Sequence, residues 1–269
     1  AIQNMLNIEP DDSVNAMLRL RGLNDEEFVN SHYVVFATKN GTIKKTCLEA
    51  YSRPRTNGVN AINIVEGDEV VDVRLTNGKN EIILANRNGR AVRFDENTVR
   101  SMGRVSTGVR GMQLDGDDDQ VVGMIIVNNA ETETVMVVSE NGYGKRSQVE
   151  DYRKTNRGGK GVKTFSITDK TGRLVAIKNV TDDNDLMIIN KSGIAIRLAV
   201  SDCRVMGRAT QGVRLINLSK KNDVIASVCK VMSSELEAKL ADDNSATEPE
   251  ATEATEATEA KETNPENEK

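Results

Sequence analysis

The sequence predicts an all-β fold built from successive propeller-like blades. An apolar run, a Gly turn and basic residues recur in VVFATKNGTIKK from Val34, IILANRNGRAVR from Ile82, VMVVSENGYGKR from Val135 and LMIINKSGIAIR from Leu186. Each copy closes on a Gly-Val pair, at Gly58, Gly108, Gly161 and Gly212. The turn glycines are 48, 53 and 51 residues apart and the closing glycines 50, 53 and 51 apart, so both landmarks step together. Such a period is typical of arrays whose units bury their apolar faces against neighbours.

Each repeat opens with a predicted β-hairpin. Asn-Gly between apolar runs favours a hairpin because a type I′ turn needs positive φ at both central residues. Three repeats carry that pair and the fourth carries Ser-Gly: Asn40-Gly41, Asn88-Gly89, Asn141-Gly142 and Ser192-Gly193. A basic loop follows, then the Gly-Val pair and a third strand, such as residues 59–64 or 213–218. An acidic turn and a last apolar strand, such as residues 70–73 or 224–228, complete about four short strands without room for a long helix.

These landmarks divide the chain into six segments. We predict the second half of a truncated blade at 1–32, whole blades at 33–80, 81–133, 134–184 and 185–232, and an acidic disordered tail at 233–269. The first residues parallel the second half of a repeat, so we expect the chain to be a piece of a longer protein. The tail carries 12 acids against 3 bases and almost no large apolar side chains, which leaves nothing to offset the entropy of ordering it. A short helix is expected at its start, from Ser233.

The charge of the body differs from that of the tail. The whole chain has a net charge of -5, yet residues 1–232 hold 33 bases against 29 acids. Four windows, 39–55, 87–110, 145–163 and 191–214, contain 23 of those 33 bases, and each ends near its Gly-Val pair. A solvated face explains any one cluster, but equivalent loops of a repeat array lie on equivalent surfaces. The four clusters together therefore predict one basic band.

A basic band along a repeat array suits a polyanion whose charges recur along a line, as in duplex DNA. Single-strand binders instead use aromatic platforms, and this chain has only four Phe and four Tyr. Loop glycines leave backbone N–H groups open to a phosphate. The predicted duplex-binding residues are Lys44, Lys45, Arg53, Arg55, Arg90, Arg93, Arg100, Arg104, Arg110, Lys145, Arg146, Arg153, Lys154, Arg157, Gly158, Gly159, Lys160, Gly161, Lys163, Arg197, Arg204, Arg208 and Arg214.

No catalytic, metal or cofactor site is predicted. Gly159-Lys160 lacks the earlier glycine of a phosphate-binding loop for ATP. The run from Asp115 to Asp119 resembles the start of a calcium loop, but Gln120 and Ile126 stand where Gly and Glu are required, so an acidic hairpin turn is the favoured interpretation. His32, the only histidine, is expected at a strand entry. The cysteines share no CxxC spacing and are expected to be reduced thiols of a cytosolic protein: Cys47, Cys203 and Cys229.

The chain resembles the C-terminal DNA-wrapping domain of bacterial DNA gyrase A subunits over residues 1–231. The segments that carry the resemblance are NGTIKKT at Asn40, NGRAVRF at Asn88, VRSMGRVSTGVRG at Val99, NGYGKR at Asn141 and GRATQGVRLI at Gly207. The resemblance implies a β-pinwheel, whose blades exchange strands and whose basic rim bends duplex DNA. In that family the wrap presents a second DNA segment to the catalytic core, so that strand passage yields negative supercoils.

The resemblance also implies partners and a location. The partners are double-stranded DNA, the catalytic core that precedes this domain in the A polypeptide and, through that core, the gyrase B polypeptide of a heterotetrameric, ATP-dependent type II topoisomerase. A cytoplasmic, nucleoid-associated protein is expected, without a membrane partner and without a cofactor in this segment. Cleavage in this class needs a tyrosine in a helical core domain, and the four tyrosines here fall in strands or loops of the array: Tyr33, Tyr51, Tyr143 and Tyr152.

Two departures from the family pattern leave alternatives open. The family usually has six blades, with a glycine-rich gyrase A box in the first. Here the nearest heptad, residues 155–161, matches only in its last five positions and lies in the third whole repeat, so the true box is expected upstream of Ala1. The alternatives are a propeller used for protein recognition and the C-terminal domain of a topoisomerase IV. The acidic tail is either a competitor for DNA phosphates or a solubilising extension.

Overall fold

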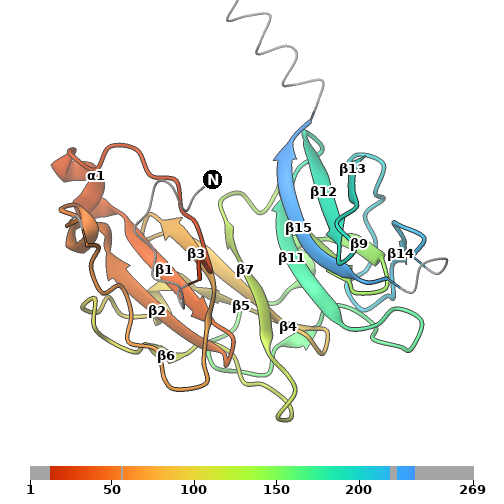
Figure 1. The fold of residues 1–269 in the computed structure, drawn as a ribbon, viewed down its shortest axis with the longest axis horizontal. Helices are drawn as coiled ribbons and strands as arrows, with labels where there is room; N and C mark the ends of the chain where they lie inside the picture. The colour runs from red at the N-terminus through yellow and green to blue at the C-terminus, as the bar shows by residue number, and fades with distance from the viewer. Residues whose placement is uncertain (1–12, 56, 219–222, 234–269) are drawn as a thin grey trace, which may run out of the picture. The chain divides into compact units, whose positions relative to one another are not determined.

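The computed structural model describes residues 13–55, 57–218 and 223–233, all within the unit Ala1–Ser233. Apart from Ser233, the predicted tail with its short helix lies outside the described residues, as do the first 12 residues of the predicted truncated blade. The regular secondary structure of the described part is almost entirely β-strand (Figure 1). Its α-helix, α1 (Glu26–Ser31), is six residues long and has Asp25 as N-cap, with the carboxylate accepting hydrogen bonds from the backbone N–H groups of Glu27 and Phe28.

The strands of the described residues form four antiparallel sheets, which confirms the predicted fold of about four-stranded blades. The first sheet has the order β3 (Val70–Thr76), β1 (Tyr33–Thr38), β2 (Thr42–Cys47), β6 (Val109–Arg110). The second has the order β10 (Val162–Lys163), β5 (Arg90–Asp95), β4 (Glu81–Asn86), β7 (Val121–Val127). The third has the order β11 (Leu174–Val180), β8 (Thr134–Ser139), β9 (Tyr143–Gln148), β14 (Val213–Arg214). The fourth has the order β13 (Ala195–Ala199), β12 (Asn184–Asn190), β15 (Ile225–Met232). Short 3₁₀ turns follow three of the hairpins: η2 (Leu48–Tyr51), η3 (Glu96–Thr98) and η4 (Val149–Asp151).

The predicted hairpins are present at all four glycine turns. Each turn glycine has a positive φ, for example 79° at Gly89. An aspartate from the acidic turn of the same repeat caps two of these hairpins: Asp68 accepts a hydrogen bond from the N–H of Asn40, and Asp119 accepts one from the N–H of Asn88. The acidic turns that the sequence shows therefore hold the hairpin turns in place.

The edge strand of each complete sheet comes from the following repeat. β6 pairs with β2, β10 with β5 and β14 with β9, and each begins directly after a closing glycine. Gly161 shows why the closing residue must be glycine: its φ is +73°, and a Cβ there would overlap the carbonyl group of Ala91 in the neighbouring strand. Gly58 provides the contrast. The described residues contain no earlier sheet for its segment to join, and a Cβ at Gly58 would meet no atom within 4 Å.

Two strand predictions were wrong. Residues 59–64 form no strand, and the predicted strand at 213–218 is only the two residues of β14. An exchanged strand needs a hairpin of the preceding repeat as its partner, and the described residues before Tyr33 contain no hairpin. Residues 13–24 form no strand either, although they belong to the predicted half-blade. Ser13 corresponds to Val70 at the start of β3, which pairs with the hairpin of its own repeat, and the described residues before Tyr33 contain no such hairpin.

The core lies between consecutive sheets. Strand β4 shows how: Ile82 and Leu84 pack with residues of the first sheet, whereas Ile83 and Ala85 pack with residues of the third. A strand buried on both faces reads as a continuous apolar run, as observed. The last strands β3, β7, β11 and β15 follow one another in Figure 1, each in contact with the next. The basic loops lie at the opposite edge of each sheet, beside the second strand of the hairpin.

Candidate nucleic-acid interface

Each basic loop runs along the outer hairpin strand of the preceding sheet. Loop 99–108 begins beside β2, where Ser101 forms a parallel bridge with Lys45, and ends at β6 near the hairpin turn. The same path recurs in loop 152–161, through the bridge of Lys154 with Arg93, and in loop 203–212, through the bridge of Val205 with Arg146. Because the three paths are equivalent, cations at equivalent loop positions recur from sheet to sheet.

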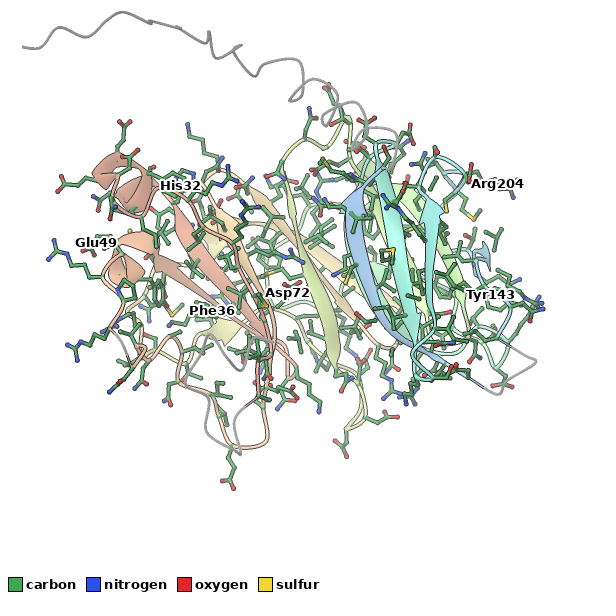
Figure 2. All side chains as sticks on the ribbon, turned by 45° about the horizontal axis from the view of Figure 1, so that its top comes forward. His32, Phe36, Glu49, Asp72, Tyr143 and Arg204 are labelled. Atoms are coloured by element: carbon green, nitrogen blue, oxygen red, sulfur yellow. The ribbon has the colours of Figure 1, made fainter. Side chains whose placement is uncertain are left out.

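Two sets of predicted contact residues recur in this way and are exposed to solvent. The loop-start cations are Arg100, Arg153 and Arg204. The exchange-strand cations, two residues after the closing glycines, are Arg110, Lys163 and Arg214. Arg214 bonds to a tyrosine; among the described residues the other five side chains make no hydrogen bond or ion pair. These six cations, which we call the rim cations, are available to an external anion. Figure 2 places Arg204 and Tyr143 at one end of the described unit and His32 and Glu49 at the other.

Four predicted DNA contacts are buried and face the protein. Lys44 and Lys145 occupy equivalent positions and are 0% and 1% exposed. The ammonium of Lys44 donates to the carbonyls of Ala61 and Arg104, and that of Lys145 donates to the carbonyl of Gly207 at 2.6 Å. Lys45 and Arg146 are also buried. Lys44 and Lys145 thus anchor loop carbonyls, whereas Lys45 and Arg146 pair with acids, so all four cations are engaged inside the protein.

The cation four residues after each turn glycine pairs with an acid in every repeat. The Nζ of Lys45 lies 2.9 Å from Glu96, and both side chains are nearly inaccessible, at 4% and 0% exposure. The other three pairs are Arg93 with Glu81 at 2.5 Å, Arg146 with Asp182 at 2.6 Å and Arg197 with Asp185 at 2.7 Å. This position was predicted to bind DNA in all four repeats, and in each repeat its cation forms an intramolecular ion pair. Both partners are nearly inaccessible in the Lys45 pair, whereas Asp182 is 71% and Arg197 37% exposed.

Several loop cations have partners in the neighbouring repeat. Arg157 donates to the carbonyl of Arg110 at 3.0 Å, and its equivalent Arg208 donates to the carbonyl of Lys163 at 2.7 Å. Both bonds fix the exchanged strand to the next loop. Further ion pairs of predicted contact residues are Lys154 with Glu81 and Asp95, Lys160 with Asp115 at 2.6 Å, and Arg90 with Asp115 at 3.9 Å.

The remaining predicted contacts lie where their repeats place them. Arg53 and Arg55 are exposed in the first loop, and Arg104 is half-buried in the second. The glycines are less open than the sequence indicated, because the N–H of Gly158 donates to the carbonyl of Gly111 and the carbonyl of Gly159 accepts from the N–H of Gln113. These bonds tie the glycine-rich loop to the second repeat, so Gly158 offers no free amide to a phosphate.

Asp119, Tyr152 and His32 make hydrogen bonds that stabilise the fold. Asp119 is buried and accepts from the side-chain amide of Asn86 at 2.6 Å, as an acidic turn requires. Among the described residues no group of His, Cys, Asp and Glu side chains could hold a metal ion. Tyr152 is fully buried against Thr164, and His32 bonds through Nδ1 to the carbonyl of Phe28 just before β1.

Burial of Lys145 predicts a pH dependence of stability. Desolvation is the main cause that lowers the pKa of Lys145 from 10.5 to about 7. Between those two values the unfolded chain binds more protons at this site, so the free energy of unfolding should rise as the pH rises from 7 toward 9.5. Lys145→Met should flatten that rise, since Val92 and Ile196 show that the equivalent position accepts an apolar side chain. Denaturant unfolding at several pH values measures this, and a rise equally steep in the variant would contradict it.

Three residues that shape this surface, Glu81, Glu96 and Lys170, were not among the predicted contacts. Glu81 and Glu96 hold cations that the composition alone assigns to DNA, and Lys170 lies outside all four basic windows. The spacing of four between turn glycine and cation was visible in the sequence. Two of its acidic partners, Glu81 and Asp185, stand at equivalent positions twelve residues before their cations. Glu96 and Asp182 come from other positions, so no single spacing covers all four pairs.

Four sheets of the same antiparallel design, three of which receive an edge strand from the next repeat, define a β-propeller-type repeat protein with cations repeated on its outer loops. The chain belongs to the family described as DNA gyrase C-terminal domain, beta-propeller, whose model matches residues 32–77, 80–128, 133–181 and 184–229. It is 41% identical over 246 residues to the DNA gyrase A protein of Staphylococcus aureus strain NCTC 8325. That match covers 91% of this chain and 27% of the relative, so the chain spans about a quarter of the length of the curated relatives it matches.

Solved structures show the same fold. The crystal structure of the C-terminal domain of DNA topoisomerase IV superimposes with a TM-score of 0.77 at 27% identity, covering 90% of this chain and 74% of the other. A structure of the DNA gyrase A C-terminal domain gives a TM-score of 0.75 at 24% identity, covering 86% and 74%. Within the described residues, no helix is both long and apolar enough to span a membrane.

Proposed function

We propose that this domain binds duplex DNA without sequence preference along the rim cations and bends it. The observation that supports the proposal is the repetition of two exposed cationic positions in three consecutive repeats, on loops that follow equivalent sheet edges. Backbone phosphates recur along a duplex, and contacts spaced along it offset the several kcal/mol that bending costs. Among the described residues no helix long enough to enter a major groove is present, which favours phosphate contact over base reading.

The relatives give the proposal its setting. The S. aureus relative is named as a DNA gyrase A protein, and from this we propose that the domain serves a type II topoisomerase that introduces negative supercoils. Its partners would then be the catalytic core of the same polypeptide and, through that core, the gyrase B polypeptide, in the bacterial cytoplasm at the nucleoid. The domain itself would contribute DNA binding and geometry rather than strand cleavage, and would need no cofactor.

The sequence leaves two other functions open. A topoisomerase IV domain shares the fold, as the first solved structure demonstrates, but the curated relatives at 41% identity are gyrase A proteins. A propeller that recognises proteins would carry an apolar or acidic outer patch. Here the repeated exposed loop positions are cationic, which favours a polyanion.

A salt series with duplex DNA tests the proposal. If the rim engages on the order of 6 to 10 phosphates, the affinity should fall by roughly 10³ to 10⁵ between 50 and 200 mM salt, equally for unrelated sequences. Fluorescence anisotropy with two labelled duplexes of different sequence measures both properties. An affinity that is flat across this range, or that depends strongly on sequence, would rule the proposal out.

A further inference from the structure

A hollow in the third sheet lies where its hairpin turn meets the exchanged strand of the next repeat. Its volume is about 300 Å³, and Asn141, Tyr143, Lys170 and Arg214 are among the residues that line it. β14 brings Arg214 directly opposite Tyr143 in the strand register. The hollow is therefore assembled by two repeats, at the hairpin end of the loop path described above.

The tyrosine holds the arginine in a fixed position. The hydroxyl O of Tyr143 accepts hydrogen bonds from Nε and Nη2 of Arg214 at 3.1 and 2.9 Å, and the guanidinium carbon lies 5.5 Å from the ring centroid. Tyr143 is only 6% exposed, so its own position is set by packing. A guanidinium has five N–H donors, and two such bonds leave others for a ligand. An arginine held in this way loses little conformational entropy on binding.

The turn 168–172 places a second cation, Lys170, at the same ring. The side-chain amide of Asn141 donates to the carbonyls of Asp169 and Lys170 at 3.2 and 3.3 Å, which fastens the turn 168–172 to the hairpin. The ammonium of Lys170 then lies 5.4 Å from the Tyr143 centroid. Asp223 also lines the hollow, but its carboxylate accepts from the hydroxyl of Ser192 at 2.6 Å and from the N–H of Val224 at 2.8 Å. The hollow is therefore lined by two cations, Lys170 and Arg214, and by one carboxylate, Asp223, that already accepts hydrogen bonds.

An equivalent hollow is present two repeats earlier. It lies between the Asn40-Gly41 turn and the exchanged segment 107–114, has a volume of about 360 Å³ and includes Arg110. Thr42 stands where the third sheet has Tyr143, so the first hollow lacks the phenol. Both hollows therefore include an exchange-strand cation, Arg110 or Arg214. The hollow in the third sheet also has a tyrosine that holds this cation.

We infer that the hollow of Tyr143, Lys170 and Arg214 is a binding site for one backbone phosphate of duplex DNA, with Tyr143 as the residue that positions Arg214. This inference rests on the proposed function and adds to it one residue, Lys170, that lies outside the basic loops, and one, Tyr143, that carries no charge. A phosphodiester fits the site because its two non-bridging oxygens share one negative charge and can accept hydrogen bonds from the two cations that line the hollow.

Three single variants and one control test the inference by anisotropy with a random-sequence duplex. Tyr143→Phe keeps the aromatic ring and the charge of Arg214 and removes only the hydroxyl that holds Arg214 in place. The affinity for DNA should therefore fall about three- to tenfold at low salt, which corresponds to the loss of one net hydrogen bond. Arg214→Gln and Lys170→Gln should each lower the slope of log affinity against log salt by up to about 0.9, the value for one phosphate. Lys79→Gln is the matched control, because Lys79 is exposed just before β4, at the opposite end of that strand from its hairpin turn. It should bind like the wild type.

The outcomes separate this inference from the proposed function. Salt-dependent binding by the wild type together with wild-type affinity of Tyr143→Phe overturns the site, as do unchanged slopes for Arg214→Gln and Lys170→Gln, while the proposed function stands. Salt-independent binding by the wild type overturns the proposed function itself. Thermal unfolding of each variant at the wild-type temperature shows that the losses do not come from misfolding.

Discussion

Replacing all six rim cations by glutamine should remove most of the affinity for duplex DNA. The exposed positions Arg100, Arg153, Arg204, Arg110, Lys163 and Arg214 form two recurring sets, and five of these side chains have no described intramolecular partner. If each meets one phosphate, the slope of log affinity against log salt should become shallower by about 5, and affinity at 50 mM salt should fall on the order of 10³-fold or more. Because these groups are exposed, stability should change little.

Variants of each set make this prediction sharper. Arg100, Arg153 and Arg204 replaced together should reduce the slope by about 2.7, and the other three replaced together by a similar amount. The replacement Lys79→Gln should leave the slope unchanged. If the six-site variant kept the wild-type slope, the rim cations would not be the phosphate contacts, and another surface of the molecule would have to bind DNA.

Lys45→Met should destabilise the fold by about 3–5 kcal/mol without weakening phosphate contact. The replacement leaves the carboxylate of Glu96 buried at 0% exposure without its cation, and breaking a buried pair at one partner carries a cost of about that size. Glu96 would keep the hydroxyl of Thr76 at 2.7 Å and the N–H of Asn80 at 2.7 Å. Denaturant unfolding measures the change in the free energy of unfolding. Salt titration of DNA binding by the folded variant shows whether the number of phosphate contacts is unchanged.

A double variant separates the ion pair from simple packing. Lys45→Met with Glu96→Gln removes both charges while an amide oxygen still accepts from Asn80, so stability should recover relative to Lys45→Met alone. The opposite result is equally clear. If Lys45→Met were as stable as the wild type but lost about 0.9 of the salt slope, Lys45 would be a phosphate contact, as its sequence context predicted.

Sequence was sufficient to predict the repeat, the hairpins and the four blades. Asn-Gly turns, apolar runs and the closing glycines are local signals, and the turn at Gly89 and the strand from Ile82 lie where those signals place them. Strand exchange could be expected only from the family resemblance. Gly161 is needed because of the carbonyl of Ala91, a residue 70 positions earlier in the chain, and no local pattern contains such a contact.

The basic band was predicted more broadly than the structure supports. A cation in a loop and a cation in a hairpin strand look alike in a sequence, yet Lys44 and Lys145 are buried while Arg110 and Lys163 are exposed. The difference arises because the loop of the next repeat covers the hairpin strand and supplies carbonyls to its lysines. Charge density predicted that the outer loops are basic, and three-dimensional pairing decided which cations remain available.

Bending of a duplex shows directly whether equivalent cations on successive sheets form one continuous path for DNA. A duplex of about 30 base pairs, well below the persistence length of about 150 base pairs, should be nearly straight when free. With fluorophores at its two ends, energy transfer should rise when the wild-type protein binds and should stay near the free value when the six-site variant is added. Tight binding by the wild type with unchanged energy transfer would contradict the continuous path.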